Sequence, residues 1–235
     1  GAFSTGVGTL TTTASMQSDS LFEHLKYDVR IDAQQVKLGK LTANPLLGSA
    51  SLALSTTGEG ALLPADSSKQ DVDKKREWRG GVSLAVQHLT YNGYAYQDLF
   101  VEGTYAPRLY DVHLRVEDEY LDVTLDGMAD LRDSSIITMD MQCRQFDSYP
   151  LRKEDTKTSR IRSSFTMAAE LNGWDAEHSQ GRVTIDSLIV ATELDSILMR
   201  QLCLASVSDA QLLPEAYVNA IIDNDILRLD GIKRD

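Results

Sequence analysis

The sequence predicts an all-β fold, built as an extended, curved and mostly antiparallel sheet. Apolar and polar residues alternate along nearly the whole chain, a period of two that is typical of strands with one shielded face and one wet face. Asn-Gly steps at Asn92-Gly93 and Asn172-Gly173 suit the two positive φ angles of a type I′ hairpin turn. Helical periodicity is weak, because the polar stretch 66–79 has no apolar stripe to bury, and we expect a surface loop there.

Each expected strand is an apolar set that repeats at every second residue. In chain order these sets fall within residues 27–31, 50–54, 112–116, 121–125, 137–143, 161–171 and 218–222. The apolar positions change from even to odd numbers across the acidic stretch 117–119, which predicts a hairpin whose two strands turn their apolar faces to the same side. Gly127, directly after Asp126, is a second turn signal.

We interpret residues 1–235 as one continuous β-groove region. The looser units within it and the charged loops that separate them are, in order, 1–65, the loop 66–80, 81–151, the loop 152–159 and 160–235. Neither loop has the length or composition of a flexible interdomain linker. The apolar face could be shielded by a second sheet, as in a sandwich, or by the opposite wall of one curved sheet, and the periodicity does not choose between them.

The charge balance argues against nucleic acid as a partner. Lys and Arg number 23 against 35 Asp and Glu, so the net charge of −12 would repel a phosphate backbone. The sequence contains no run of about 18 apolar residues, so it predicts no membrane-spanning helix. The opening residues lack the basic and apolar regions of a signal peptide, and we expect the chain to be an internal piece of a longer protein.

No pattern of residues predicts catalysis, a cofactor or a metal site. The four histidines lie in separate segments, and the sequence has no nucleophile elbow, phosphate-binding loop or dinucleotide fingerprint. The carboxylates fall on the wet phase of strands or in turns, and the cluster Asp223-Asn224-Asp225 lacks the glycine and the terminal Glu of a calcium loop. We therefore predict a protein that is not an enzyme. Whether Cys143 and Cys203 form a disulfide is left open.

Residues 81–131 resemble the repeating unit of the TamB/AsmA-like family of Gram-negative envelope proteins. The matching features are a glycine-led opening strand, an aromatic-glycine-aromatic hairpin from Tyr91 to Tyr96, and the phase-changing hairpin 110–126. A later stretch, which begins at LNGWDAEHSQGRVTIDS, looks like a further unit. The resemblance covers about two-thirds of the chain, by strand rhythm more than by fixed residues.

The resemblance implies a U-shaped, taco-like groove with an apolar interior. It also implies a non-enzymatic segment of a periplasm-spanning protein, a translocation and assembly module that carries phospholipid or assists outer-membrane assembly. Such a segment would be periplasmic and part of a longer chain anchored in the inner membrane. Its partners would be phospholipid acyl chains, neighbouring repeats of the same chain and an outer-membrane assembly protein. An apolar strip suits acyl chains, because each buried methylene contributes about 0.8 kcal/mol.

The residues that we expect to line the groove share the apolar phase of their strands. They are Val112, Leu114, Val116, Leu121, Val123, Leu125, Met139, Met141, Phe165 and Met167. The alternative is a secreted β-sandwich, an adhesin or a carbohydrate-binding module. A sugar-binding face needs exposed aromatic rings near polar side chains, and the sequence offers Tyr91, Tyr94 and Tyr96 beside Asn92 and Gln97.

Overall fold

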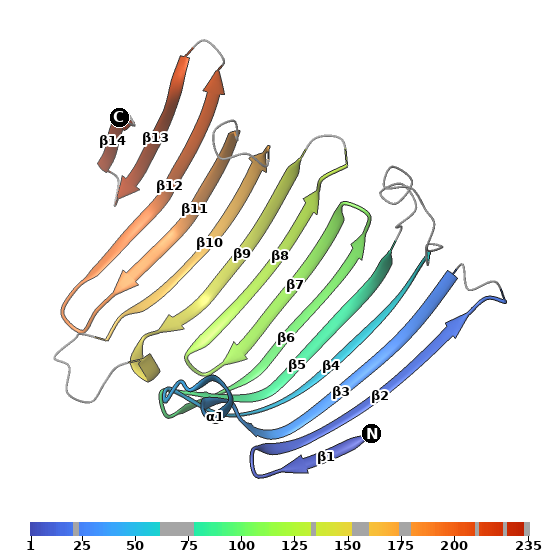
Figure 1. Ribbon diagram of the computed structural model, residues 1–235. Helices are drawn as coiled ribbons and strands as arrows, with labels where there is room; N and C mark the ends of the chain where they lie inside the picture. The colour runs from blue at the N-terminus through green and yellow to red at the C-terminus, as the bar shows by residue number, and fades with distance from the viewer. Residues whose placement is uncertain are drawn as a thin grey trace. The chain divides into compact units, whose positions relative to one another are not determined.

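A computed structural model describes the chain apart from residues 21–23, 62–77, 133–134, 152–159, 174–179, 210–211, 223–224 and 233–235. It is almost entirely β-strand, and each strand pairs antiparallel with its neighbour in the chain within the two compact units that it forms, Gly1–Asp118 and Glu119–Asp235 (Figure 1). The sheet is not closed in the part of the chain that the structure describes. The predicted all-β, antiparallel fold class is confirmed.

The first unit contains seven strands and one short helix. They are β1 (Ala2–Thr5), β2 (Gly8–Ser18), β3 (His24–Lys37), α1 (Leu38–Thr42), β4 (Leu47–Ala61), β5 (Arg79–Tyr91), β6 (Tyr94–Ala106) and β7 (Leu109–Asp118). The helix buries none of its side chains, and Ala43, in the left-handed conformation, ends it. Arg79 and Gly80, which the sequence places in a charged loop, already belong to β5. The rest of that predicted loop, from residue 66 to residue 77, lies outside the described residues, as does all of the second loop, 152–159.

The second unit contains seven further strands and one 3₁₀ turn. They are β8 (Leu121–Asp130), β9 (Ile136–Asp147), η1 (Tyr149–Leu151), β10 (Arg162–Asn172), β11 (Gln180–Ala191), β12 (Ser196–Asp209), β13 (Leu212–Ile222) and β14 (Asp225–Ile232). No helix among the described residues is long and apolar enough to cross a membrane.

The predicted turns have different outcomes. Asn92 and Gly93 both have positive φ angles, 49° and 84°, and join β5 to β6 as the type I′ turn that the sequence predicts. Asn172 is instead the last residue of β10 and pairs with Gln180, so Asn172-Gly173 is not a two-residue hairpin turn. Gly127 lies inside β8 opposite Met139, so it is not a turn residue.

The described residues include few fully buried side chains. The buried hydrophobic residues are Ala33, Ala50, Val86, Val116, Val123 and Cys143, all of them small or medium in size. Within each unit the strands form a single layer, so the larger apolar side chains pack only against their neighbours on the same face. An apolar face that keeps part of its area in water is unusual in a compact domain and suits a surface that receives a partner.

Candidate functional site: the apolar face

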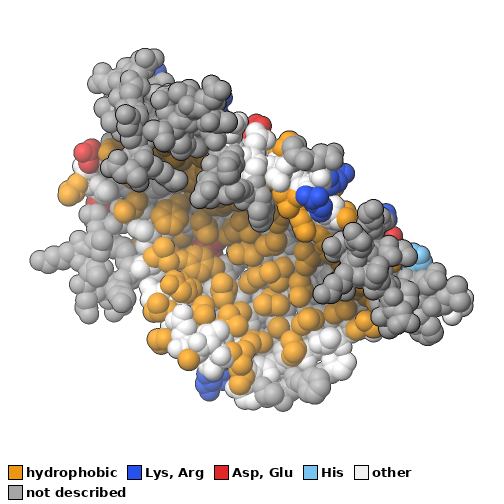
Figure 2. All heavy atoms as spheres, turned by 45° about the horizontal axis from the view of Figure 1, so that its top comes forward, with side chains coloured by type: hydrophobic (Ala, Val, Ile, Leu, Met, Phe, Trp, Pro, Cys, Tyr) orange, Lys and Arg blue, Asp and Glu red, His pale blue; other side chains and the backbone are white. Residues whose placement is uncertain are grey.

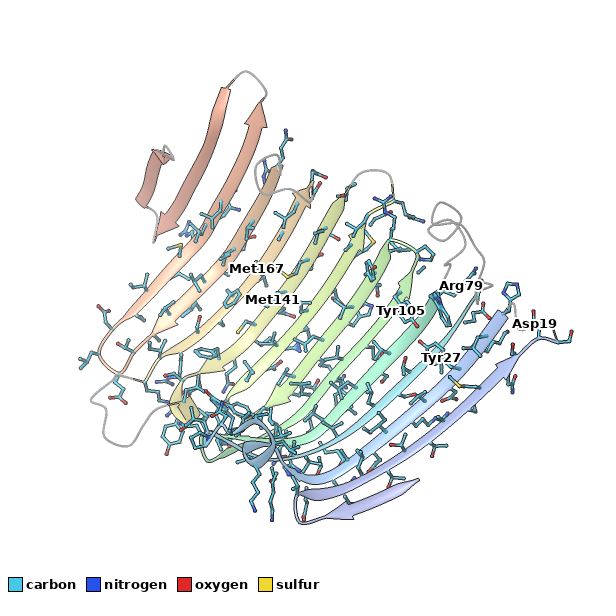
Figure 3. The ribbon with its side chains drawn as sticks, in the orientation of Figure 1. Asp19, Tyr27, Arg79, Tyr105, Met141 and Met167 are labelled. Atoms are coloured by element: carbon cyan, nitrogen blue, oxygen red, sulfur yellow. The ribbon has the colours of Figure 1, made fainter. Side chains whose placement is uncertain are left out.

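The apolar face of the second unit is built from rows of side chains that cross the strands. Because residues paired in an antiparallel ladder point to the same side of the sheet, the register defines each row. The central row, which we call the methionine row, crosses β8 to β12 and contains Leu125, Met141, Met167, Ile185 and Leu202. Met141 and Met167 lie side by side on β9 and β10 (Figure 3). No residue of this row is charged or polar.

The rows on either side of the methionine row are also apolar. One contains Val123, Cys143 and Phe165, and the other contains Gly127, Met139, Ala169 and Val183. Leu121 pairs with Phe146, which in turn pairs with Ser163. The predicted lining residues of this unit therefore share one face, and most of them are half-buried. Their contact with lipid stays a prediction.

The first unit has an equivalent pair of rows, which we call the aliphatic rows. One contains Ile31, Leu54, Leu84, Val101 and Leu114, and the other contains Ala33, Leu52, Val86, Leu99 and Val116. Of the predicted lining residues, Leu114 and Val116 complete these rows, and Val112 lies one row further along, opposite Gly103 and 38% exposed. The members from β3 to β6 were not predicted as lining residues, although the same alternation marks them in the sequence.

Figure 2 shows hydrophobic side chains crowded together on the face that it presents. An aliphatic row crosses five strands, β3 to β7, so it extends for four strand spacings, about 19 Å. One leaflet accounts for about half of a hydrocarbon core that is about 30 Å thick, so such a row is at least as long as the hydrocarbon of one leaflet is deep. Each unit thus offers an apolar strip of the length of a lipid tail.

The opposite face of each sheet is polar and in water. Asp126 and Asp140 are direct cross-strand partners, an arrangement that is tolerated where water screens the like charges. Arg144 donates to both carboxylate oxygens of Asp122, at 3.1 Å. In the first unit, His113 lies 3.0 Å from Asp111 with a side chain that is 59% exposed.

An aromatic cluster, which we call the tyrosine clasp, borders the apolar face of the first unit. The row next to Val112 contains Tyr27, Gly58, Gly80 and Tyr105, and the hydroxyl groups of the two tyrosines contact each other directly above the glycines (Figure 3). A Cβ atom at Gly58 would lie 2.7 Å from the Tyr105 hydroxyl and from the Tyr27 ring, so only glycine leaves space for the pair. Burial and the Tyr27 hydroxyl raise the pKa of Tyr105 to about 12.

Trp78 extends the clasp. Its indole ring lies against Gly60, where an added Cβ would overlap it, and its centroid is 6.1 Å from that of Tyr27. The sequence did not predict this cluster. Tyr27 and Tyr105 are 78 residues apart, and only the register of the intervening strands brings them together.

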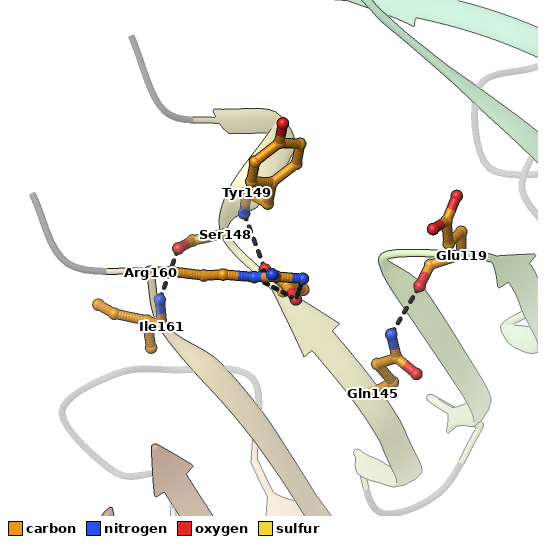
Figure 4. Close-up of polar contacts among 7 residues, drawn as sticks. Glu119, Gln145, Ser148, Tyr149, Arg160 and Ile161 are labelled. Atoms are coloured by element: carbon orange, nitrogen blue, oxygen red, sulfur yellow. Dashed lines mark hydrogen bonds and ion pairs between the residues drawn. The ribbon is translucent and has the colours of Figure 1, made fainter. Parts of the chain in front are cut away.

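A polar cluster in the second unit joins the end of β9 to the residues just before β10. Asp147 accepts hydrogen bonds from the Tyr149 backbone N–H, at 2.9 Å, and from Arg160 Nε and Nη2, at 2.9 and 2.5 Å (Figure 4). The Arg160 guanidinium lies 5.2 Å from the centre of the Tyr149 ring, which stacks on Tyr120. These contacts lower the pKa of Asp147, with the Arg160 hydrogen bonds as the largest cause.

Neither cysteine forms a disulfide. Cys143 lies on the apolar face, in the row of Val123 and Phe165, whereas Cys203 pairs with Thr184 on the polar face. Two thiols on opposite faces of one sheet cannot bond without a large backbone movement. In the described residues no group of three or more His, Cys, Asp or Glu side chains could hold a metal ion. The segment Asp223-Asn224-Asp225 falls partly outside the described residues.

The tyrosines expected for a sugar-binding face pack against one another. Tyr94 and Tyr96 meet edge to face with their ring centres 4.8 Å apart, and the Tyr94 hydroxyl donates to Asp118 at 2.9 Å. Burial raises the pKa of Tyr96. Half-buried, perpendicular rings do not present the flat platform on which a sugar stacks.

A shallow hollow on the polar face of the first unit, about 350 Å³ in volume, is lined by small polar residues of β4 and β5, such as Ser55 and Ser83, and by Glu102, Asp111 and His113 of β6 and β7. No protein-family model matches the chain, and no significant match was found among curated proteins or among solved structures.

Proposed function

We propose that the chain is a non-enzymatic segment of a periplasm-spanning protein and that its apolar faces hold the acyl chains of phospholipid during transfer or outer-membrane assembly. The observation that carries this proposal is the methionine row, which crosses five strands without a polar side chain and stays half-exposed. A half-exposed apolar strip gains free energy when an apolar ligand covers it, at roughly 25 cal/mol per Å².

The type of side chain supports an acyl ligand. Met141 and Met167 are unbranched and polarizable, so they adapt to chains that differ in length and unsaturation. The resemblance of residues 81–131 to the TamB/AsmA-like repeat supports the periplasmic setting, the longer parent chain, and partnership with neighbouring repeats and an outer-membrane assembly protein. None of the rows requires a cofactor.

Native mass spectrometry of the purified chain after incubation with phospholipid vesicles tests the proposal. We expect bound phospholipid on the wild type and on Gln142→Asp, and its loss from Met141→Asp. The two variants place the same charge at adjacent positions of β9, but Met141 lies on the apolar face and Gln142 on the polar face. A wild type that binds no phospholipid, or that binds glycans tightly instead, would contradict the proposal and favour a carbohydrate-binding module.

A further inference from the structure

We propose that the tyrosine clasp holds the ester end of a bound lipid, while the acyl chain runs from the clasp along the strands and across the aliphatic rows. This inference rests on the proposed function, because it assigns a polarity to a lipid on the apolar face of the first unit. Two hydrogen-bond donors of the clasp have no acceptor among the residues that the structure describes.

The donors follow from counting protons in the clasp. Tyr27 and Tyr105 have one hydroxyl proton each, and their mutual hydrogen bond uses only one of them. The second hydroxyl proton and the Trp78 indole N–H have no hydrogen-bond acceptor within the described residues. All three side chains are half-buried, so these donors are open to a ligand. Because the pKa of Tyr105 is about 12, its hydroxyl keeps its proton at neutral pH.

The position of the clasp is that of a boundary. Between it and the aliphatic rows lies one row, which contains Val29, Thr56, Val82, Gly103 and Val112. The rows on the far side are entirely aliphatic, and the nearer one lies four residues along β3 from the clasp, from Tyr27 to Ile31, which is about 13 Å. A bound chain would therefore pass from hydrocarbon neighbours to hydrogen-bond donors along the strands. Tyr and Trp occupy the same border between hydrocarbon and headgroup in membrane proteins.

The chemistry of the clasp favours ester carbonyls over phosphate. A diacyl phospholipid has two ester carbonyl oxygens, which accept hydrogen bonds and are neutral, and the clasp offers two neutral donors. Phosphate groups usually recruit Arg or Lys. The basic residues next to the clasp along these strands, Lys26 and Arg79, occupy the alternate positions and pair with Glu59 on the polar face.

Three glycines leave the space that the aromatic side chains of the clasp occupy. Gly58 lies beneath the Tyr27 ring and the Tyr105 hydroxyl, Gly60 beneath the Trp78 ring, and Gly80 beneath the Tyr105 hydroxyl. A methyl group at any of them would collide with these side chains or with the backbone. Glycine weakens a strand interior, so three of them on two adjacent strands have a cost in stability that the ring placement explains.

Fluorescence of Trp78 tests the polarity of the bound lipid. In Trp174→Phe, Trp78 is the only tryptophan of the chain. We expect phosphatidylcholine brominated near the carbonyl end of its chains to quench Trp78 more strongly than the same lipid brominated near the methyl end. Equal quenching, or stronger quenching from the methyl end, with lipid shown to be bound by native mass spectrometry, would overturn the inference and leave the proposed function standing. Absence of any bound lipid would overturn both.

Ether lipids, which lack ester carbonyls, test the donors. We expect the full chain to bind diester phosphatidylcholine about five- to tenfold more tightly than its diether analogue, as the loss of two hydrogen bonds predicts. The double variant Tyr27→Phe, Tyr105→Phe keeps both rings over the glycines and removes one of the two donors. Because the Trp78 N–H remains, the preference should fall to about two- to threefold. The control Tyr94→Phe removes a hydroxyl of the same unit away from the clasp and should keep the full preference. An unchanged preference in the double variant, or none in the wild type, would refute the assignment.

Discussion

The ion pair between Asp147 and Arg160 offers the sharpest test of how the second unit is held together. Asp147 ends β9 with a side chain that is only 1% exposed, and its carboxylate accepts from the Tyr149 backbone and from two nitrogens of Arg160. The main chain closes the same polar cluster, since Ile161 N donates to Ser148 Oγ and Ser148 N donates to the Ile161 carbonyl. The substitution Asp147→Asn keeps the shape of the side chain and removes its charge.

We expect Asp147→Asn to lower the free energy of unfolding by about 2 kcal/mol. Charge-assisted hydrogen bonds contribute about 1.5–3 kcal/mol, and the value lies below that of a fully buried pair because Arg160 stays 35% exposed and can be hydrated. Urea unfolding followed by circular dichroism measures the difference. The control Asp122→Asn breaks an exposed bridge to Arg144 and should change the free energy by about 0.5 kcal/mol.

The pH dependence gives an independent measurement. The pKa of Asp147 is lowered in the folded state, so its stabilisation is complete above the unfolded pKa, about 3.9, and is lost as the pH falls through the folded value. The difference between wild type and Asp147→Asn should therefore be constant near neutral pH and shrink below about pH 4. A variant as stable as wild type at pH 7, or a difference that does not shrink in acid, would refute this reading of the ion pair.

Three further measurements follow from the structure. Gly58→Ala should separate the tyrosine hydroxyls, and a difference titration of phenolate absorbance should show the pKa of Tyr105 falling from about 12 toward its ordinary value; an unchanged titration would contradict the clasp geometry. Cys203 should react with a thiol reagent faster than Cys143, because burial raises the pKa of Cys143. The reverse order would contradict the placement of Cys143 on the apolar face. Met141→Asp should lower the free energy of unfolding by about 1–3 kcal/mol, because the side chain is half-buried, whereas global unfolding would indicate a closed core.

Alternation predicted the strands well. Each strand has one face in water and one apolar face, so polar and apolar residues must alternate along it. Alternation alone does not show where a strand changes phase without ending. Gln35, Asp98 and Ser187 have φ angles of 50°, 51° and 54°, and at each of them the apolar positions of the strand change parity, as from Ile185 to Leu188. Such a change resembles a turn in a sequence, yet each of these strands continues through it.

The candidate site was predictable only in part, because its rows depend on register. The methionine row needs the exact alignment of five strands, and only its first three members were expected from their phase. The tyrosine clasp had no local signal at all. Its two tyrosines lie on different strands. Its glycines alone predict only a weakened strand, because their role depends on the rings above them.

The apolar rows and the tyrosine clasp contribute differently to lipid binding. The rows supply binding free energy, and the clasp sets the orientation of the lipid. Aliphatic and methionine side chains make contacts that depend on area and not on direction, so a chain could slide along them with little change in free energy. Hydrogen bonds depend on direction, and the clasp is the place on the described apolar face of the first unit where donors without acceptors meet that surface. A groove made of aliphatic rows alone would hold a lipid in either direction. With the clasp at one border, one direction satisfies two donors and the other leaves them in hydrocarbon, where an unpaired polar group is unfavourable by about 1–3 kcal/mol. That difference is large enough to orient a lipid and small enough to let it leave.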